Sequence, residues 1–299
     1  MPRPPSRLAT TPGTTEDRAA ARAAGRDRGG RAAGRDRGGR ARSGTAQGRW
    51  LPVGGVAVAL AIFELVPRAG LVDDRFLPPV SSMLVALLGM VSDGSLRLPV
   101  GQTLLGWALG LGLAVLVALP LGILIGSVFL LFRATRSIVE FLRPVPSVAL
   151  IPLAVLVFGV GLESKVFLAA WAATWPILLQ TLYGVRDVDP VATETARSFK
   201  VPARTRLCRV ILPSALPYVA TGVRISAAVA LILVVTAELV LGAPGLGQQI
   251  NIARQSAAVE TMYGLIIVTG LIGWGLNAAM ARVEARLLAW HPSHREQAR

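Results

Sequence analysis

The sequence has few of the residues from which catalytic and metal sites are usually built. Its 299 residues include one cysteine, Cys208, which excludes an intramolecular disulfide. The two histidines, His291 and His294, lie in the polar C-terminal segment, and a metal site needs three or four ligands at defined spacing. No H-E-x-x-H, G-x-S-x-G or C-x-x-C motif occurs. We therefore predict no metal site and no catalytic residue.

Lysine is almost absent as well. The chain has two lysines, Lys165 and Lys200, and neither follows a glycine, so there is no phosphate-binding loop of the G-x-x-x-x-G-K-[ST] type. The chain is therefore not expected to bind ATP in that way or to hold any other cofactor. Transport or scaffolding becomes the default function for a protein of this composition.

Charge is scarce outside the N-terminal tail, and long apolar runs take its place. Only 16% of the residues are charged, 53% are hydrophobic, and the mean hydropathy is +0.57. This balance predicts an all-α membrane protein, in which a span needs about 20 apolar residues. Six runs qualify: Leu51–Val66, Gly101–Gly126, Ser147–Gly161, Val166–Val185, Ile225–Leu246 and Tyr263–Met280. The third has 15 residues and is too short to span alone unless its flanks contribute.

The distribution of Lys and Arg predicts the orientation. If both termini are cytoplasmic, 25 of the 31 basic residues fall on the inner side. The inner segments are then 1–49, 127–146, 184–217 and 282–299. We expect a multi-pass protein of the cell membrane, in contact with the lipid bilayer.

The N-terminal tail, residues 1–49, differs from the rest of the chain. It repeats RAAGRDRGG in tandem from Arg22 and contains 12 arginines, one leucine and no aromatic residue. Such a segment cannot bury a core and is predicted to be disordered. We favour a passive extension, or a segment outside the translated protein, over contact with anionic lipid and over nucleic-acid binding. The predicted domains are this tail, a transmembrane domain at 50–292 and a second tail at 293–299.

A charged loop, residues 189–217, interrupts the apolar C-terminal part. Asp189-Pro190 is a helix start, with an N-cap residue followed by proline at the first helical position. Pro202 can open a second short helix in the same way, since Val201 before it is biased away from helix. The loop is therefore predicted to form two short amphipathic helices.

The same loop resembles the EAA loop of ABC importer permeases, whose pattern is E-A-A, three residues, glycine, nine residues, I-x-L-P. Glu194 matches the glutamate, Ala196 the second alanine, and Leu212-Pro213 the final pair. Lys200 occupies the position of the glycine, where a left-handed turn would cost a non-glycine residue about 1 kcal/mol. The resemblance covers roughly residues 50–292.

Membership of this family implies particular partners. Such a permease has the MetI-like fold of the type I importers and forms a dimer, expected here to be a homodimer. It receives solute from an extracytoplasmic binding protein and is driven by separate ATPase subunits that bind ATP and Mg²⁺. The resemblance assigns contact with the ATPase to Glu194, Ala196, Arg197, Phe199, Lys200, Leu212 and Pro213. We expect Phe199 to be the main apolar contact; the alternative is that it packs against its own membrane domain.

Further matches point to the sulfonate, nitrate and taurine branch of the family. Arg143–Pro146 (RPVP) resembles the entry to the third span in that branch, and Gly242–Leu246 (GAPGL) resembles its outer loop. The implied solute is small and anionic. Glu238, Gly242, Gly245 and Gly247 are candidates for the pathway or gate. Glu238 could also hold the loop Gly242–Gly247, or it could be an interfacial carboxylate that faces water.

Glycines predict where spans approach closely, and Gln248–Ser256 predicts a short outer helix. The glycines are Gly106, Gly110, Gly112, Gly122 and Gly126 in the second span and Gly264, Gly270, Gly273 and Gly275 in the last.

Two other functions are alternatives to the importer permease. A secondary transporter or channel would need polar relays or an inverted repeat, and neither is seen. A membrane-anchored scaffold would act through the arginine-rich tail.

Overall fold

The computed structural model describes residues 47–288, with side chains from residue 54. Most of the predicted N-terminal tail, both histidines and the predicted tail at 293–299 lie outside the described residues. The chain forms two units, Met1–Val56 and Ala57–Arg299, and all helices discussed below, apart from the start of the first, belong to the second unit.

Between residues 47 and 288 the secondary structure is entirely helical, which confirms the predicted class. Four helices, counting α9–α10 as one, are long and apolar enough to cross a membrane, and a bent pair makes five if it forms one span. The predicted first span coincides with α2, so the expected number of about six is a fair approximation.

In chain order the elements are α2 (Gln47–Arg68), α3 (Val80–Ser92), α4 (Arg97–Ser127), α5 (Phe129–Leu142), η1 (Ser147–Leu150), α6 (Ile151–Phe158), α7 (Leu162–Arg186), α8 (Pro190–Ser198), α9 (Ala203–Arg206), η2 (Leu207–Ile211), α10 (Leu212–Leu241), α11 (Leu246–Gln255) and α12 (Val259–Leu287).

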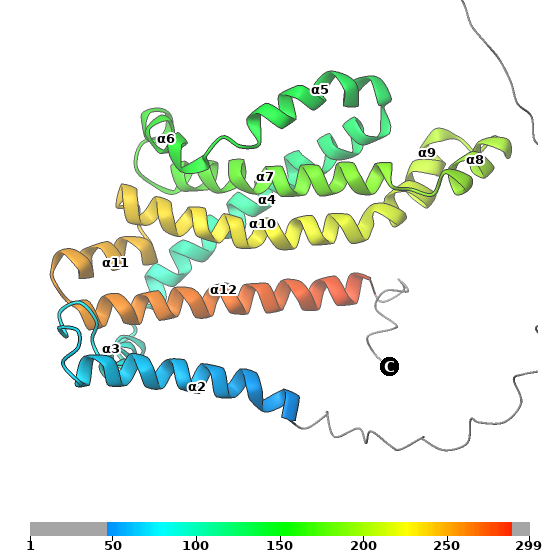
Figure 1. Cartoon of the computed structure of the whole chain (residues 1–299). Helices are drawn as coiled ribbons and strands as arrows, with labels where there is room; N and C mark the ends of the chain where they lie inside the picture. Colours follow the sequence, from blue (N-terminus) through cyan, green and yellow to red (C-terminus); the bar gives the residue numbers. More distant parts are fainter. Residues whose placement is uncertain (1–46, 289–299) are drawn as a thin grey trace, which may run out of the picture. The chain divides into compact units, whose positions relative to one another are not determined.

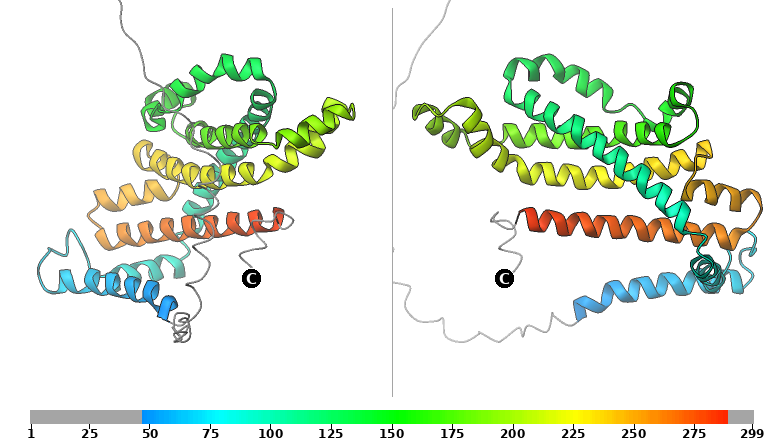
Figure 2. Two further views of the ribbon diagram at one scale, coloured as in Figure 1. Left: turned by 45° about the vertical axis from the view of Figure 1, so that its right-hand side comes forward. Right: turned by 180° about the vertical axis from the view of Figure 1, so that it is seen from behind.

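Helix α7 lies at the centre of the core, between α4 and α10 (Figure 1). The α4–α7 contact is made of small residues: an added Cβ on Gly110 would lie 2.6 Å from Ala169 Cβ, and one on Gly122 would lie 2.7 Å from Thr181 Cβ. Without a hydrophobic driving force between helices in lipid, such close approach supplies the packing energy. Figure 2 shows α4 crossing α7 and α10, which run side by side.

The glycine prediction is confirmed for four positions in α4 and is wrong for some others. Gly106 and Gly126 also face α7, at Lys165 and Val185. Gly112, Gly270 and Gly275 have no atom within 4 Å of an added Cβ, so they mediate no close approach between described helices.

The third span was placed wrongly. The segment 127–146, predicted as an inner loop, contains α5, and α5 together with η1–α6 is apolar enough for the membrane as a pair bent by 83°, which forms either a broken span or a re-entrant loop. The break falls at Arg143–Pro146, where two prolines remove backbone donors. Arg143, counted as a residue of a cytoplasmic loop, therefore lies at the bend of this pair.

The fifth span is longer than expected at its start and shorter at its end. Helix α9 continues through the π-helical turn η2 into α10, giving one apolar helix from Ala203 to Leu241. The last six residues of the charged loop, 212–217, are therefore the first turns of α10. Leu246 begins α11, which confirms the predicted short outer helix.

Candidate functional site

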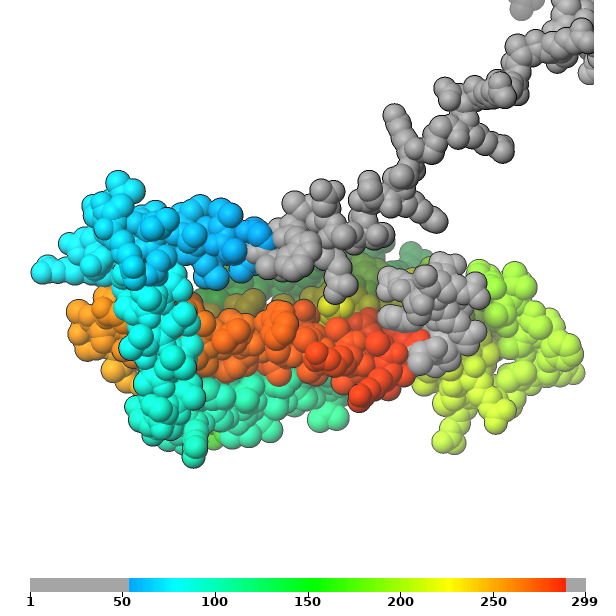
Figure 3. Space-filling view, turned by 90° about the horizontal axis from the view of Figure 1, so that it is seen from below, coloured from blue at the N-terminus to red at the C-terminus, as the bar shows by residue number. Residues whose placement is uncertain are grey.

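The charged loop forms a helical projection at one end of the described chain. We call the end where α7 finishes and α10 begins the loop end, and the other the opposite end. Asp189 caps α8, because its Oδ1 accepts a hydrogen bond of 2.8 Å from the Val191 amide, and Pro190 occupies the first turn. In Figure 3 the yellow-green residues of α8 and α9 protrude at this end.

The break after α8 lies at Lys200 itself, not at Pro202. Lys200 has φ of +54°, in the left-handed region. Its amide bonds to Arg197 O at 2.8 Å and the next amide, of Val201, bonds to Ala196 O at 3.0 Å. This is the Schellman pattern of a helix C-terminus. The turn that glycine would serve is thus preserved with a lysine in it, and Pro202 then caps α9.

The strained backbone at Lys200 predicts that glycine is more stable than alanine at this position. Lys200→Gly should be more stable than Lys200→Ala by about 1 kcal/mol, because only glycine reaches positive φ without steric cost. The pair of variants isolates the backbone, since both remove the charge. Hydrogen-exchange protection of the α8 amides measures the difference.

Arg197 provides the matched control with the opposite sign. It lies inside α8, so Arg197→Ala should exceed Arg197→Gly in protection by about 1 kcal/mol. Equal protection in Lys200→Gly and Lys200→Ala would contradict the left-handed turn.

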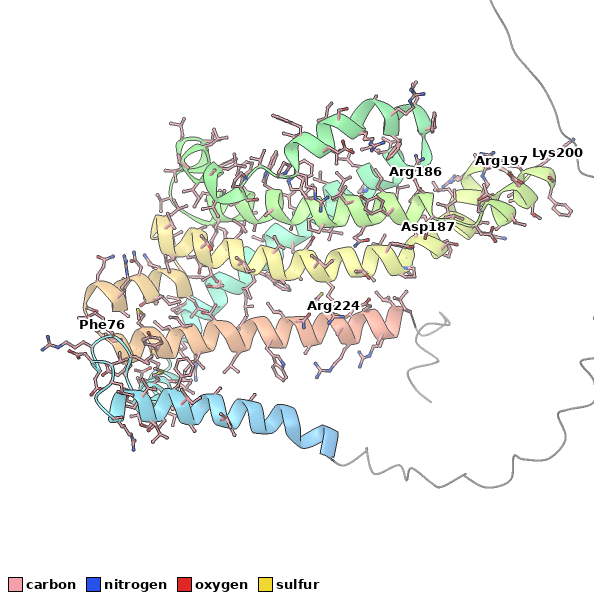
Figure 4. The ribbon with its side chains drawn as sticks, in the orientation of Figure 1. Phe76, Arg186, Asp187, Arg197, Lys200 and Arg224 are labelled. Atoms are coloured by element: carbon pink, nitrogen blue, oxygen red, sulfur yellow. The ribbon has the colours of Figure 1, made fainter. Side chains whose placement is uncertain are left out.

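The predicted contact residues are presented on this projection. Phe199 is 79% exposed, so the alternative in which it packs against its own membrane domain is wrong for the described residues. Glu194, Arg197 and Lys200 are also exposed, and Figure 4 shows Arg197 and Lys200 at its tip, beyond Arg186 and Asp187. Ala196 is half-buried. Leu212 and Pro213 lie in the first turn of α10 instead, at the base of the projection.

Side chains at the loop end join this base to the membrane helices. The Tyr218 hydroxyl of α10 donates a hydrogen bond to Asp187, which follows α7. The Arg186 guanidinium lies 3.8 Å from the centre of the Phe132 ring of α5. A cation over an aromatic face is attracted by the ring quadrupole. Displacement of the projection would therefore reach α5, α7 and α10 together.

At the opposite end Glu238 is completely buried, so the interpretation of it as a water-facing carboxylate is wrong. Its Oε1 lies 2.8 Å from Lys165 Nζ, and Lys165 is 2% exposed. Its Oε2 accepts hydrogen bonds from the Thr103 hydroxyl at 2.8 Å and from the Gly247 amide at 3.1 Å. This carboxylate joins α4, α7 and α10 to the glycine-rich loop 242–247.

Sequence reasoning missed Lys165, which completes the network. Its ammonium also donates to Pro244 O at 2.7 Å and Gln102 O at 3.0 Å. Charged residues inside spans normally pair. A lone lysine and a lone glutamate at the same end of two adjacent spans was the signal that could have suggested this ion pair.

The three candidate gate glycines have different surroundings. A Cβ on Gly245 would meet the Glu238 carboxylate, and one on Gly247 would meet Val235 O. Gly242 has φ of +68° and open space around it. Gly245 is thus required by close approach to the buried carboxylate, Gly247 by close approach to the backbone of α10, and Gly242 by its backbone conformation. Their part in a gate stays a prediction.

Comparison with known protein families matches residues 118–288, more than half of the chain, to the binding-protein-dependent transport system inner membrane component. The chain belongs to this family. The permease is therefore a membrane-embedded transport subunit, and the secondary-transporter, channel and scaffold alternatives are set aside.

Curated relatives of the permease agree. It is 33% identical over 246 residues to the taurine transport system permease protein TauC of Escherichia coli, covering 81% of this chain and 90% of the relative. It is 31% identical to the putative aliphatic sulfonates transport permease protein SsuC of Bacillus subtilis, and this match covers 85% of this chain and 90% of the relative. The nitrate import permease protein NrtB of Leptolyngbya laminosa is 30% identical, with 67% and 72% covered.

Solved structures support the fold. The permease matches an inward-facing form of the MetNI methionine ABC transporter with a TM-score of 0.55 at 20% identity, covering 63% of this chain and 94% of that one. An amino acid ABC transporter gives a TM-score of 0.53 at 20% identity, with 67% and 95% covered. The MetI-like fold expected from the sequence is confirmed.

Proposed function

We propose that this permease is the membrane subunit of an ATP-driven importer and that the α8–α9 projection docks on a separate ATPase, which binds ATP and Mg²⁺. The observation that carries the proposal is Phe199, a large apolar side chain left 79% exposed at the tip of a charged projection. Val191, on the same helix, is 68% exposed. An apolar anchor within a polar rim is the usual anatomy of a protein interface.

The remaining contact residues have two roles under this proposal. Glu194, Ala196, Arg197 and Lys200 form the docking surface around Phe199. Leu212 and Pro213 begin α10 and transmit displacement of the projection into that span. The loop end is then cytoplasmic, with both termini on the same side, as the distribution of basic residues predicts.

Further partners follow from the same proposal. A second copy of the permease completes a homodimer, and an extracytoplasmic binding protein delivers solute to the opposite end. The solute is a small anion. The relatives named for aliphatic sulfonates and nitrate support this class, and taurine, for which a third relative is named, carries the same sulfonate group beside an ammonium group.

The docking proposal is tested by Phe199→Asp. This variant should reduce co-purification with a co-expressed candidate ATPase subunit by at least about tenfold, since a buried charge replaces the apolar anchor. Phe76→Asp is the matched control, because Phe76 is 73% exposed and lies at the opposite end (Figure 4). It should leave co-purification unchanged.

Glu194→Arg provides a second, polar test on the same surface and should also weaken the complex. Retention of the ATPase by both Phe199→Asp and Glu194→Arg would contradict the proposed docking surface. Equal losses in Phe199→Asp and Phe76→Asp would mean that the substitution harms the protein in general.

A further inference from the structure

The break in the third span opens onto a cavity. It has a volume of about 520 Å³ and lies between the break, α7 and α10. Trp175 and Pro176 lie at the middle of α7, and Ile225 and Val229 lie at the middle of α10. The cavity is therefore about halfway along both spans.

Its lining combines an apolar wall with donors that have no acceptor. Arg143 and Gln180 line the cavity, and neither side chain makes a hydrogen bond or ion pair within residues 47–288. The buried Nε1 of Trp175, in the same wall, also has no acceptor among the described residues. Arg143 is exposed and Gln180 is half-buried, so both donors are open to the cavity, and polar groups within spans normally pair or face a pathway.

The lining of this cavity carries positive charge only. Arg143 is its charged residue, and no acidic side chain contributes to it. The nearest carboxylate on the same helix, Glu140, lines a neighbouring cavity and is paired with Arg136 at 2.8 Å. A guanidinium without a carboxylate partner offers planar donors suited to an oxyanion.

The cavity continues toward the loop end. A second cavity of about 340 Å³ shares Arg143 and Tyr183 with it, and a third of about 350 Å³ shares Tyr183 and reaches Arg186 and Asp187. One tyrosine thus lines all three. The row leads from the middle of the spans to the base of the projection, which is the course that an imported solute would follow.

We propose that the cavity at Arg143 is the permease's own binding site for the transported solute. Arg143 binds the oxyanion group, Gln180 adds a donor, and the α10 wall receives the short organic part. This inference deepens the proposed function and rests on it for the identity of the solute as cargo. It assigns selectivity for negative charge to the permease as well as to the binding protein.

Direct binding to the full-length permease in detergent tests the site. The probe is ethanesulfonate, measured by equilibrium dialysis, with ethyltrimethylammonium as a cation of similar size. The wild type should bind ethanesulfonate and not the cation. Arg143→Gln should weaken binding by at least about tenfold, as expected for loss of a hydrogen bond to a charged group.

Three variants complete the design. Arg143→Lys keeps the charge and should lose less than Arg143→Gln. Gln180→Leu should weaken binding a few-fold and carries the test if Arg143→Gln does not fold. Arg254→Gln, on α11 at the opposite end and outside all three cavities, should bind as the wild type does.

The proposal is overturned if the wild type fails to bind ethanesulfonate, if both probes bind equally, or if Arg143→Gln or Gln180→Leu binds like the wild type. Failure here is separable from failure of the proposed function. Anion binding is measured on the permease alone, whereas docking is measured by co-purification with the ATPase through Phe199.

Discussion

Lys165→Met should be the most destabilising single substitution in the described chain, at a cost of about 3–5 kcal/mol. The reason is that Glu238 is completely buried and would lose its ion-pair partner. The two carbonyl oxygens that Lys165 satisfies, of Gln102 and Pro244, would also be left without a donor. The thermal unfolding midpoint of the detergent-solubilised protein measures the effect.

A second substitution should rescue the first. In Lys165→Met/Glu238→Gln the buried charge is gone, so the double variant should unfold at a higher temperature than Lys165→Met alone. A glutamine can still accept from Thr103 and from the Gly247 amide. Additive losses in the double variant would show that the pair is not coupled.

The exposed pair Arg136–Glu140 is the control. Arg136 Nε lies 2.8 Å from Glu140 Oε1, the same distance as between Lys165 Nζ and Glu238 Oε1, but both side chains of the Arg136–Glu140 pair are more than 60% exposed. Arg136→Met should lower the unfolding midpoint far less than Lys165→Met, because the remaining Glu140 carboxylate is exposed and lines a cavity rather than being buried. Equal shifts in Lys165→Met and Arg136→Met would mean that Lys165 is not buried with Glu238.

Gly247→Ala should have the second-largest effect, about 3 kcal/mol, because the new methyl group would meet Val235 O and Leu239 N of α10. Backbone atoms cannot turn aside as a flexible side chain can. The loop would have to move away from α10 and lose the Gly247 hydrogen bond to Glu238. The same thermal unfolding assay reports this loss.

Gly242→Ala separates backbone strain from steric overlap. Gly242 needs a positive φ but has free space around it, so alanine there should cost only about 1 kcal/mol. Solute uptake by both variants then tests the predicted gate. If Gly247→Ala proves as stable as Gly242→Ala, the loop does not rest on α10 as described.

Much of the fold followed from local signals. The apolar runs predicted the spans, and Asp189-Pro190 predicted the start of α8, because a cap and a proline act within one helical turn. Glycines in the second span predicted close approach to another helix, and four of the five face α7. The two misplacements, at the third and fifth spans, have one cause. Both spans contain prolines and arginines, which local reasoning takes as loop signals.

The candidate site residues also fall into those that lie close together in the sequence and those that meet only in the folded protein. The proposed docking residues could be named from the sequence because they lie within one short loop that resembles a family motif. The complete Glu238 network could not, since Thr103, Lys165 and Gly247 are separated from one another by more than 60 residues and meet only when α4, α7 and α10 pack. Only the Lys165–Glu238 pair had a signal, in two lone charges at the same end of adjacent spans. Arg143 was assigned to a loop because a count of Lys and Arg along the sequence does not show how far along a span each residue lies.

The sequence by itself determined the class of the protein, the approximate number of spans, the charged loop and the absence of a phosphate-binding loop. These depend on composition and on neighbours within a few residues. The tertiary structure alone showed that Lys200 adopts a left-handed turn, that Glu238 is buried against Lys165 and that Arg143 lines a cavity halfway along the spans. The burial of Glu238 and the position of Arg143 depend on which helices pack together, because burial and pairing are properties of contacts between segments distant in the chain. The turn at Lys200 is local instead, since it closes through hydrogen bonds to Arg197 and Ala196.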